Sequence, residues 1–251
     1  MRITGPLESA ALLTVLPVPR GATTSARGVL PWAPLVGLVL GGIATGVALL
    51  GDRWISPLAG AVLGIAVLAL LTRGLHLDGL ADTADGLGTL RGRERALQVM
   101  RQSDVGPFGV VTLVLILLLQ VACLSALLET RWGWLACWTA VAVARLAMAR
   151  TGLPRVPTAE GSALGALVAN TVSRLWLASW GAVLLGLLAS ATITDPQAAV
   201  RLAGSALAGL LGAELLLRRA RARLGGVSGD VMGAMAETAM AATLLVAAIA
   251  L

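Results

Sequence analysis

The sequence predicts an all-α fold, a polytopic integral membrane helical bundle with about seven transmembrane helices and a short N-terminal interfacial helix. Hydrophobic residues make up 57% of the 251 residues and charged residues only 13%, which is far too apolar for a soluble domain. Apolar stretches of about 20 residues, the length that crosses a bilayer as a helix, recur along the chain. Backbone groups in lipid must be satisfied within their own segment, so these stretches should be helices.

The expected spans follow one another with short connections. The segment before them is expected to form a short helix at the inner interface, ended by Pro17 and Pro19. No linker is long enough to separate two domains, so residues 1–251 are expected to form a single membrane-embedded domain. The seven expected spans are 33–50, 55–72, 106–128, 132–150, 175–193, 198–217 and 232–251.

The arginines predict the orientation of these spans. All 19 basic residues are arginines, and a cytoplasmic N-terminus leaves only Arg53, Arg131 and Arg201 in the outer segments, with residues such as Arg2 and Arg20 inside. We therefore expect a multi-pass membrane protein with its N-terminus and its active site facing the cytoplasm. The arginines flank the spans and do not alternate with aromatic residues, so the expected partner is the lipid bilayer and not a nucleic acid.

One short window, His76 to Gly86, holds three aspartates and the only histidine of the chain. Carboxylates beside a membrane span are costly to desolvate and usually mark a functional site. On a helix, Asp78, Asp82 and Asp85 would fall within about 40° of one another. Such a group needs a cation between its members, or one carboxyl must stay protonated. Mg²⁺ prefers hard oxygen ligands that it shares with phosphate, so we expect Mg²⁺ here.

The place of His76 relative to these carboxylates depends on the helix. On a regular helix His76 would point about 200° away from Asp78. It would join the carboxylates only if the helix broke at Gly74 or Gly79. A general base and an ordinary interfacial histidine are therefore both open interpretations.

A second acidic pair begins the last expected span. Asp230 and Glu237 are seven residues apart and share a helix face. Glu237 would lie about ten Å into the membrane, where a carboxylate without a role is costly. Asp230 could instead be a favourable charge at a helix N-terminus. We expect the pair to line one polar cavity with the three aspartates. Arg145 either snorkels to the interface or pairs with phosphate or with one of these carboxylates.

An acidic cluster with arginines nearby suits a phosphate ester or pyrophosphate substrate. The chain has no P-loop and no lysine, so ATP hydrolysis is not expected. Residues 82–86 have the D-x-x-D-G form that resembles the start of the CDP-alcohol phosphotransferase signature, but the Ala-Arg that follows in that family is missing. A transporter is a second alternative, although its polar residues would be spread through the bilayer midplane.

A closer resemblance is to the cobalamin (5′-phosphate) synthase family, also called adenosylcobinamide-GDP ribazoletransferase. Residues 76–86 are similar to its H-x-D-G-L-A-D-T-x-D-G signature, and residues 13–19 to its T-x-L-P-x-P segment. Arg145 and the pair Glu160-Gly161 fall where that family has an Arg and an E-G pair. Residues 229–237 are similar to its G-D-x-x-G-A-x-x-E segment. Together these motifs cover nearly the full length.

The resemblance implies a transferase reaction late in cobalamin biosynthesis, in the cytoplasmic membrane of a bacterium or an archaeon. A ribose hydroxyl of α-ribazole, or of its 5′-phosphate, attacks the pyrophosphate of adenosylcobinamide-GDP, and GMP leaves as adenosylcobalamin or its phosphate forms. The implied partners are these corrinoid-nucleotide and ribazole substrates, and a homo-oligomer or a complex with other enzymes of the pathway is left open. One departure is Gln102, because the family commonly has an aspartate there and a carboxylate role at this position cannot carry over.

The resemblance also assigns expected roles. The catalytic residues are expected within the acidic window, and they are Asp82, Asp78, Asp85 and His76. The Mg²⁺ ligands are expected among the carboxylates Asp78, Asp82, Asp85 and Asp230. The residues expected to bind or orient the substrates are Arg145, Asp230, Glu237 and Glu160. The hydroxyl proton would pass to His76 or to one of the aspartates.

Overall fold

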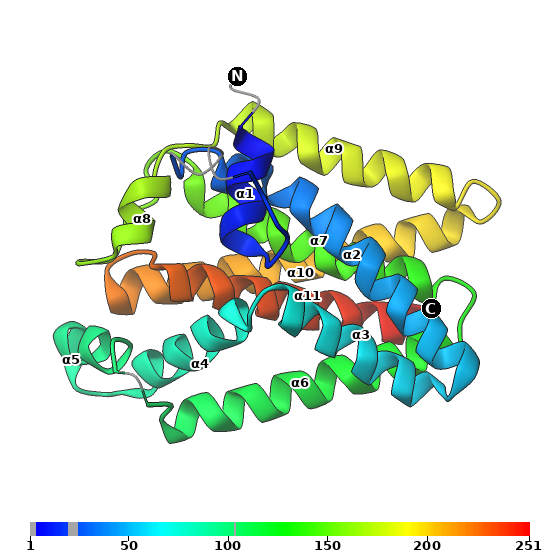
Figure 1. The fold of residues 1–251 in the computed structure, drawn as a ribbon, viewed down its shortest axis with the longest axis horizontal. Helices are drawn as coiled ribbons and strands as arrows, with labels where there is room; N and C mark the ends of the chain where they lie inside the picture. Colours follow the sequence, from blue (N-terminus) through cyan, green and yellow to red (C-terminus); the bar gives the residue numbers. More distant parts are fainter. Residues whose placement is uncertain (1–3, 20–24, 103) are drawn as a thin grey trace.

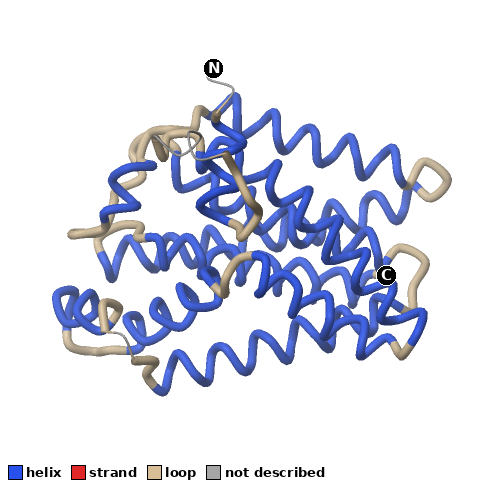
Figure 2. The backbone as a smooth tube through the Cα atoms, in the orientation of Figure 1, coloured by secondary structure: helices blue, strands red, loops and turns tan. Residues whose placement is uncertain are grey.

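Long helices running along a common direction form the body of the protein, in a computed structural model that describes residues 4–19, 25–102 and 104–251 (Figure 1). Arg2 and Arg20, which belong to the predicted arginine excess, lie outside these described residues. Within them the backbone is helix and loop without a strand (Figure 2), and its one isolated β-bridge joins Thr158 to Val227. The predicted all-α fold is confirmed.

Each apolar stretch that was expected to span the membrane coincides with one helix. These helices are α2 (Val29–Trp54), α3 (Pro57–Leu71), α6 (Pro107–Leu128), α7 (Gly133–Ala149), α9 (Arg174–Ala191), α10 (Pro196–Leu224) and α11 (Gly229–Ala250). In the described part of the chain, five of them are long and apolar enough to cross a membrane, and α3 together with α4 (Leu75–Gly88) counts as a sixth if the bent pair is one span. Helix α7 has only 17 residues.

The shorter elements lie at the ends of these helices. They are α1 (Gly5–Leu13), α5 (Gly92–Val99), the 3-10 turn η1 (Arg150–Gly152) and α8 (Ala163–Val168). Helix α1 fits the predicted N-terminal helix, and it packs on α2. The buried Glu8 carboxylate of α1 accepts a hydrogen bond of 2.8 Å from the Gly28 amide just before α2. That contact fixes the entry of the first long helix.

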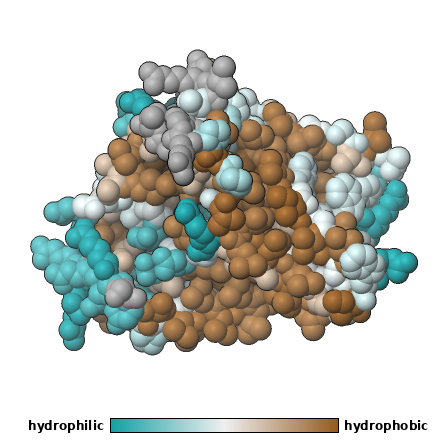
Figure 3. Space-filling model, in the orientation of Figure 1, coloured by the Kyte–Doolittle hydropathy of each residue, from teal (hydrophilic) through white to brown (hydrophobic). Residues whose placement is uncertain are grey.

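On the face of the bundle that Figure 3 shows, the surface is apolar around the middle and hydrophilic at the two ends. Helix α6 contributes exposed side chains to it, including Val111, Leu115 and Leu118. Large aliphatic groups are stable on a surface only if lipid or another apolar partner covers them. A multi-pass membrane protein accounts for this pattern.

Helix α7 lies at the centre, and small residues let its neighbours approach it. A Cβ atom added at Gly37 of α2 would lie 2.9 Å from Cβ of Arg145, and one added at Gly41 would lie 2.9 Å from Cδ1 of Trp138. The Trp138 indole also donates a hydrogen bond of 2.9 Å to the Leu38 carbonyl. Helices in lipid associate through this close packing, because no hydrophobic force drives them together.

At the end of the bundle opposite α5, Asp195 ties two segments together. It accepts hydrogen bonds from the Trp132 indole at 2.9 Å and from the Ala198 amide at 3.1 Å, and so starts α10 beside α7. These two donors, the indole first, hold the pKa of the Asp195 carboxyl below its usual value.

The close packing of α2 on α7 predicts a strong position dependence for glycine substitutions. We expect Gly37→Leu to lower the free energy of unfolding by about 1–3 kcal/mol, because the new side chain would meet the α7 backbone. The matched control is Gly42→Leu on the same helix, where an added Cβ meets nothing within 4 Å. Thermal unfolding in detergent measures both; equal melting temperatures would contradict the packing described.

Candidate active site

The acidic window begins at a sharp break in the backbone. Arg73 and Gly74 both have left-handed backbone angles, with φ of 56° and 67°, and α4 leaves α3 at 89°. The N-terminal segment holds this break, since the Arg73 guanidinium donates a hydrogen bond of 3.0 Å to the Leu12 carbonyl and the Val15 amide one of 2.8 Å to the Leu71 carbonyl. The break turns α4 toward the start of α11.

Helices α4 and α11 cross with almost no side chain between them. A Cβ added at Gly79 would lie 2.7 Å from the carbonyl oxygen of Asp230, and one added at Gly233 would lie 3.0 Å from Cα of His76. Each helix therefore supplies a glycine where the other passes. This crossing brings the acidic window of α4 to Asp230, which lies about 150 residues away along the chain.

The crossing assembles a group of carboxylates. The negative charges of Asp78, Asp230 and Asp85 all act on the carboxylate of Asp82, and that of Asp78 acts on Asp230. Asp78 is exposed and Asp82 half-buried, so both are open to a ligand from outside. The structure thus brings together the four carboxylates that were predicted as metal ligands; their role in binding a metal stays a prediction.

Asp85 differs from the other three in its environment. It is buried, and its two oxygens accept hydrogen bonds from the amides of Gly106 and Gly109, at 2.8 and 2.9 Å. Both amides belong to the start of α6, where backbone N–H groups have no partner within the helix. Asp85 therefore anchors α6 to α4.

Asp230 is held by the loop that leads into α11. Ser228 caps the helix by accepting a hydrogen bond of 3.3 Å from the Val231 amide, and its hydroxyl donates one of 3.1 Å to Asp230. Val227 in the same loop pairs with the segment before Glu160. Its amide donates a hydrogen bond of 2.9 Å to the Pro157 carbonyl. The loop of Glu160 is thereby fixed beside Asp230.

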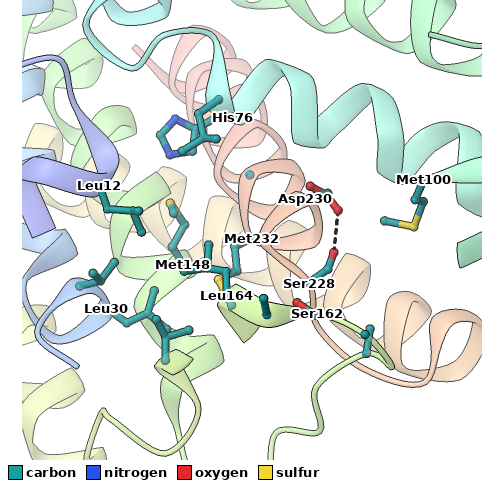
Figure 4. A pocket seen from close by; sticks show the side chains of 18 of the residues that line it. Leu12, Leu30, His76, Met100, Met148, Ser162, Leu164, Ser228, Asp230 and Met232 are labelled. Atoms are coloured by element: carbon teal, nitrogen blue, oxygen red, sulfur yellow. Dashed lines mark hydrogen bonds between the residues drawn. The ribbon is translucent and has the colours of Figure 1, made fainter. Parts of the chain in front are cut away.

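A cavity of about 300 Å³ opens on Asp230 (Figure 4). Its walls are largely aliphatic, and Leu12, Leu30, Met148, Leu164 and Met232 lie around it (Figure 4). The polar groups of its rim come from separate segments and are Arg101, Glu160, Ser162 and Ser228. The Arg101 guanidinium donates a hydrogen bond of 2.7 Å to the Glu160 carbonyl and so closes one side of the rim.

His76 faces this cavity from the side of α4 opposite to Asp78 and Asp82. The helix breaks before Leu75 and is continuous through Asp78 and Asp82, so the break does not rotate His76 toward the carboxylates. His76 lines the cavity, whereas Asp78 and Asp82 do not. The side chain is 2% exposed, and its Nε2 has no hydrogen-bond partner among the residues described.

Glu237 and Arg145 form a separate polar group deeper in the bundle. The buried Glu237 carboxylate accepts a hydrogen bond of 2.8 Å from the Gln120 amide of α6. Arg145 is 2% exposed and does not snorkel to the interface, and its charge and that of Glu237 act on each other. All three line a small cavity that does not include Asp78, Asp82 or Asp230. The phosphate contact of Arg145 therefore stays a prediction.

The sequence-based prediction did not include Gln120 or Arg101. Gln120 carries the only side-chain amide in residues 107–128, where the only other polar side chains are two hydroxyls, and this signal could have identified it. Arg101 belongs to a run of arginines with nothing in the sequence to set it apart. Only the fold places it against Glu160.

The carboxylate group suits a divalent cation that shares its ligands with a substrate. In the described part of the chain, no three His, Cys, Asp or Glu side chains form a ready-made metal cage. Mg²⁺ does not require such a cage, since it usually takes one or two carboxylates together with water and substrate phosphates. The open pair Asp78 and Asp82, with Asp230 beside it, fits this donor set.

Comparison with known proteins finds relatives along the whole chain. The family model of cobalamin-5-phosphate synthase matches residues 6–248. An adenosylcobinamide-GDP ribazoletransferase of Frankia casuarinae is 41% identical over 94% of this chain and 91% of its own length. Enzymes of the same name from Nocardioides sp. and Bradyrhizobium diazoefficiens are 39% and 36% identical, over 93% and 96% of this chain and 93% and 91% of their own lengths. No solved structure gives a significant match.

The two environments of the aspartates predict different effects on stability. We expect Asp85→Ala to lower the free energy of unfolding by about 1–3 kcal/mol, because it removes the carboxyl acceptor of one buried and one partly buried amide. Asp78→Ala is the matched control, since its side chain is exposed on the same helix. Thermal unfolding of both variants measures the difference; a control that is destabilised as much as Asp85→Ala would refute the anchoring role.

Proposed function

Because the chain belongs to the cobalamin-5-phosphate synthase family and is a transferase, we propose that it joins adenosylcobinamide-GDP to α-ribazole or its 5′-phosphate. A ribose hydroxyl attacks the phosphorus on the aminopropanol side of the pyrophosphate, the bond to the GMP oxygen breaks, and adenosylcobalamin or its phosphate forms. The observation that carries the proposal is the crossing of α4 and α11, which sets three carboxylates beside a small apolar cavity.

Asp78 and Asp82 would hold Mg²⁺, and the ion would offset negative charge on the pyrophosphate when bound. The exposure of Asp78 and the half-exposure of Asp82 leave room for phosphate oxygens beside them. Asp85 supports this pair by fixing α6 against α4. The site lies on the cytoplasmic side in this proposal, since the segments around it carry most of the arginines.

Asp230 orients the attacking hydroxyl and receives its proton. Among the three open carboxylates it alone lines the cavity, while the charges of Asp78 and Asp82 lie next to it. Its Ser228 hydrogen bond fixes the carboxylate in place. A base within reach of both the cavity and the phosphate site is what a general-base step requires.

The cavity beside Asp230 is the subsite for the bicyclic base of ribazole. At about 300 Å³ it is at the lower end of ligand cavities, too small for a corrin ring. Its aliphatic walls suit an apolar base with methyl groups and offer little to the polar edge of guanine. Ribazole bound there would point its ribose toward Asp230, and the corrinoid would stay outside.

The reaction can be tested directly. Purified protein in liposomes, given adenosylcobinamide-GDP, α-ribazole and Mg²⁺, should release GMP, and a chelator should stop the release until Mg²⁺ is restored. We expect Asp82→Asn to reduce the release by at least about 10³-fold, because it removes a ligand of the phosphate-bound ion.

The matched control is Asp52→Asn in the last turn of α2, a helix that ends at the end of the bundle opposite α5 (Figure 1); this variant should react at the wild-type rate. Folded wild-type protein without GMP release would refute the proposed reaction. Activity of Asp82→Asn close to that of wild type would remove Asp82 from the site.

The base subsite predicts a selective effect on one substrate. Leu164→Trp on α8 fills the cavity, so the KM for α-ribazole should rise about tenfold or more while the KM for adenosylcobinamide-GDP changes little. Leu167→Trp on the same helix is the control, since that side chain is 61% exposed and does not line the cavity. Steady-state kinetics with each substrate varied in turn measure both constants; an equal rise in both for Leu164→Trp would contradict the subsite.

A further inference from the structure

A second cavity, larger than the one beside Asp230, lies on the other side of helices α7 and α11. It measures about 750 Å³ and is bounded by α7, α9, α10 and the segment after η1. Met235 of α11 lines it, whereas Met232 and Gly233 line the cavity beside Asp230. On α7, Leu146 faces the large cavity and Met148 the small one. Helices α7 and α11 thus separate the two.

The large cavity exists because α9 stands away from α10 in its first half, where Trp176 and Trp180 instead hold it to α2 by donating hydrogen bonds of 2.7 and 3.1 Å to the Pro31 carbonyl. Helices α9 and α10 are joined by a short turn and diverge from it toward the end that carries α8 (Figure 1). The buried residues of α9 are Leu184 and Leu188, both in its second half. Between the first half of α9 and the middle of α10 lie apolar walls that include Leu177, Leu210 and Leu211.

Arginines from four segments gather at this cavity. They are Arg150 of η1, Arg155 of the following loop, Arg174 at the start of α9 and Arg221 near the end of α10. The one carboxylate of the lining is Glu214, and it is already bound by Arg150 and Arg218, each at 3.3 Å.

The remaining arginines of this cluster have no acidic partner. In the ranges that the structure describes, no carboxylate lies within 4.0 Å of the guanidinium groups of Arg155, Arg174 or Arg221. Arg155 also has a left-handed backbone with φ of 69°, a costly conformation for a residue with a side chain. The cavity is therefore apolar along its walls and strongly positive at one end.

We propose that this cavity binds an anionic phospholipid. The guanidinium groups match the oxygens of a phosphodiester, and Arg binds phosphate through paired hydrogen bonds. The aliphatic walls match acyl chains, and α9 belongs to the part of the chain apolar enough to span a bilayer. Basic pockets between transmembrane helices are a known form of anionic lipid recognition. A soluble anion would leave the apolar walls unused.

The test measures lipid retention and needs no turnover. The full-length protein is reconstituted in vesicles of phosphatidylcholine with phosphatidylglycerol, extracted into mild detergent, and analysed by native mass spectrometry. We expect the wild type to retain phosphatidylglycerol in preference to phosphatidylcholine. The triple variant Arg155→Gln, Arg174→Gln and Arg221→Gln should lose that preference by about tenfold or more.

The control for the loss of charge is a triple variant at the opposite end of the bundle, with Arg53→Gln, Arg131→Gln and Arg201→Gln. It should keep the preference for phosphatidylglycerol. A second variant tests the apolar wall with every arginine in place. Gly181→Leu fills open space in the cavity, since an added Cβ there meets nothing within 4 Å. It should reduce the retention of phosphatidylglycerol severalfold without lowering the melting temperature.

Three results would overturn the proposal. They are a wild type without preference for the anionic lipid, retention by both cavity variants at the wild-type level, and binding of soluble glycerol 3-phosphate as tight as that of the lipid. The last result would mean that the apolar walls contribute nothing and that the site takes a soluble phosphate.

Discussion

The close approach of α4 and α11 is the contact on which the rest of the site depends. Gly79 and Gly233 let the two backbones pass where any side chain would collide. The crossing sets Asp230 beside the acidic window, leaves His76 on the opposite face, and separates the aspartates from the deeper Glu237. Two glycines thus determine which polar residues can act together, because helices in lipid come this close only where side chains are absent.

The segments around the crossing hold it in a fixed geometry. The N-terminal segment binds the break between α3 and α4 through Arg73, and the pairing of Val227 with Pro157 fixes the loop before α11. Arg101, which follows α5, donates a hydrogen bond to the Glu160 carbonyl and so holds the loop before α8, the loop that contains Pro157. In each of these contacts a side chain or an amide donates a hydrogen bond to the backbone carbonyl of a distant part of the chain, so the site is built from most of its length.

Environment divides similar side chains into different roles. Asp85 is buried on two amides and supports α6, whereas Asp78 and Asp82 remain open to a ligand. Glu237 is satisfied by Gln120 inside the bundle. The arginines divide in the same way, since Arg145 is enclosed and Arg155 has no acidic partner in the described ranges. The members of each group carry the same kind of ionisable side chain, and burial makes the difference.

The sequence alone determined the membrane-embedded helical bundle, the family and the acidic window, because hydropathy and residue spacing are local properties. It also predicted that His76 points away from Asp78, since that follows from the helical repeat of one segment. The tertiary structure decided that Asp85 anchors α6, that Arg145 is buried near Glu237, that Gln120 binds Glu237 inside the bundle, and that Arg101 closes the rim of the cavity beside Asp230. These facts depend on which helices meet, and a periodic pattern says which face of a helix is polar but not what lies opposite it.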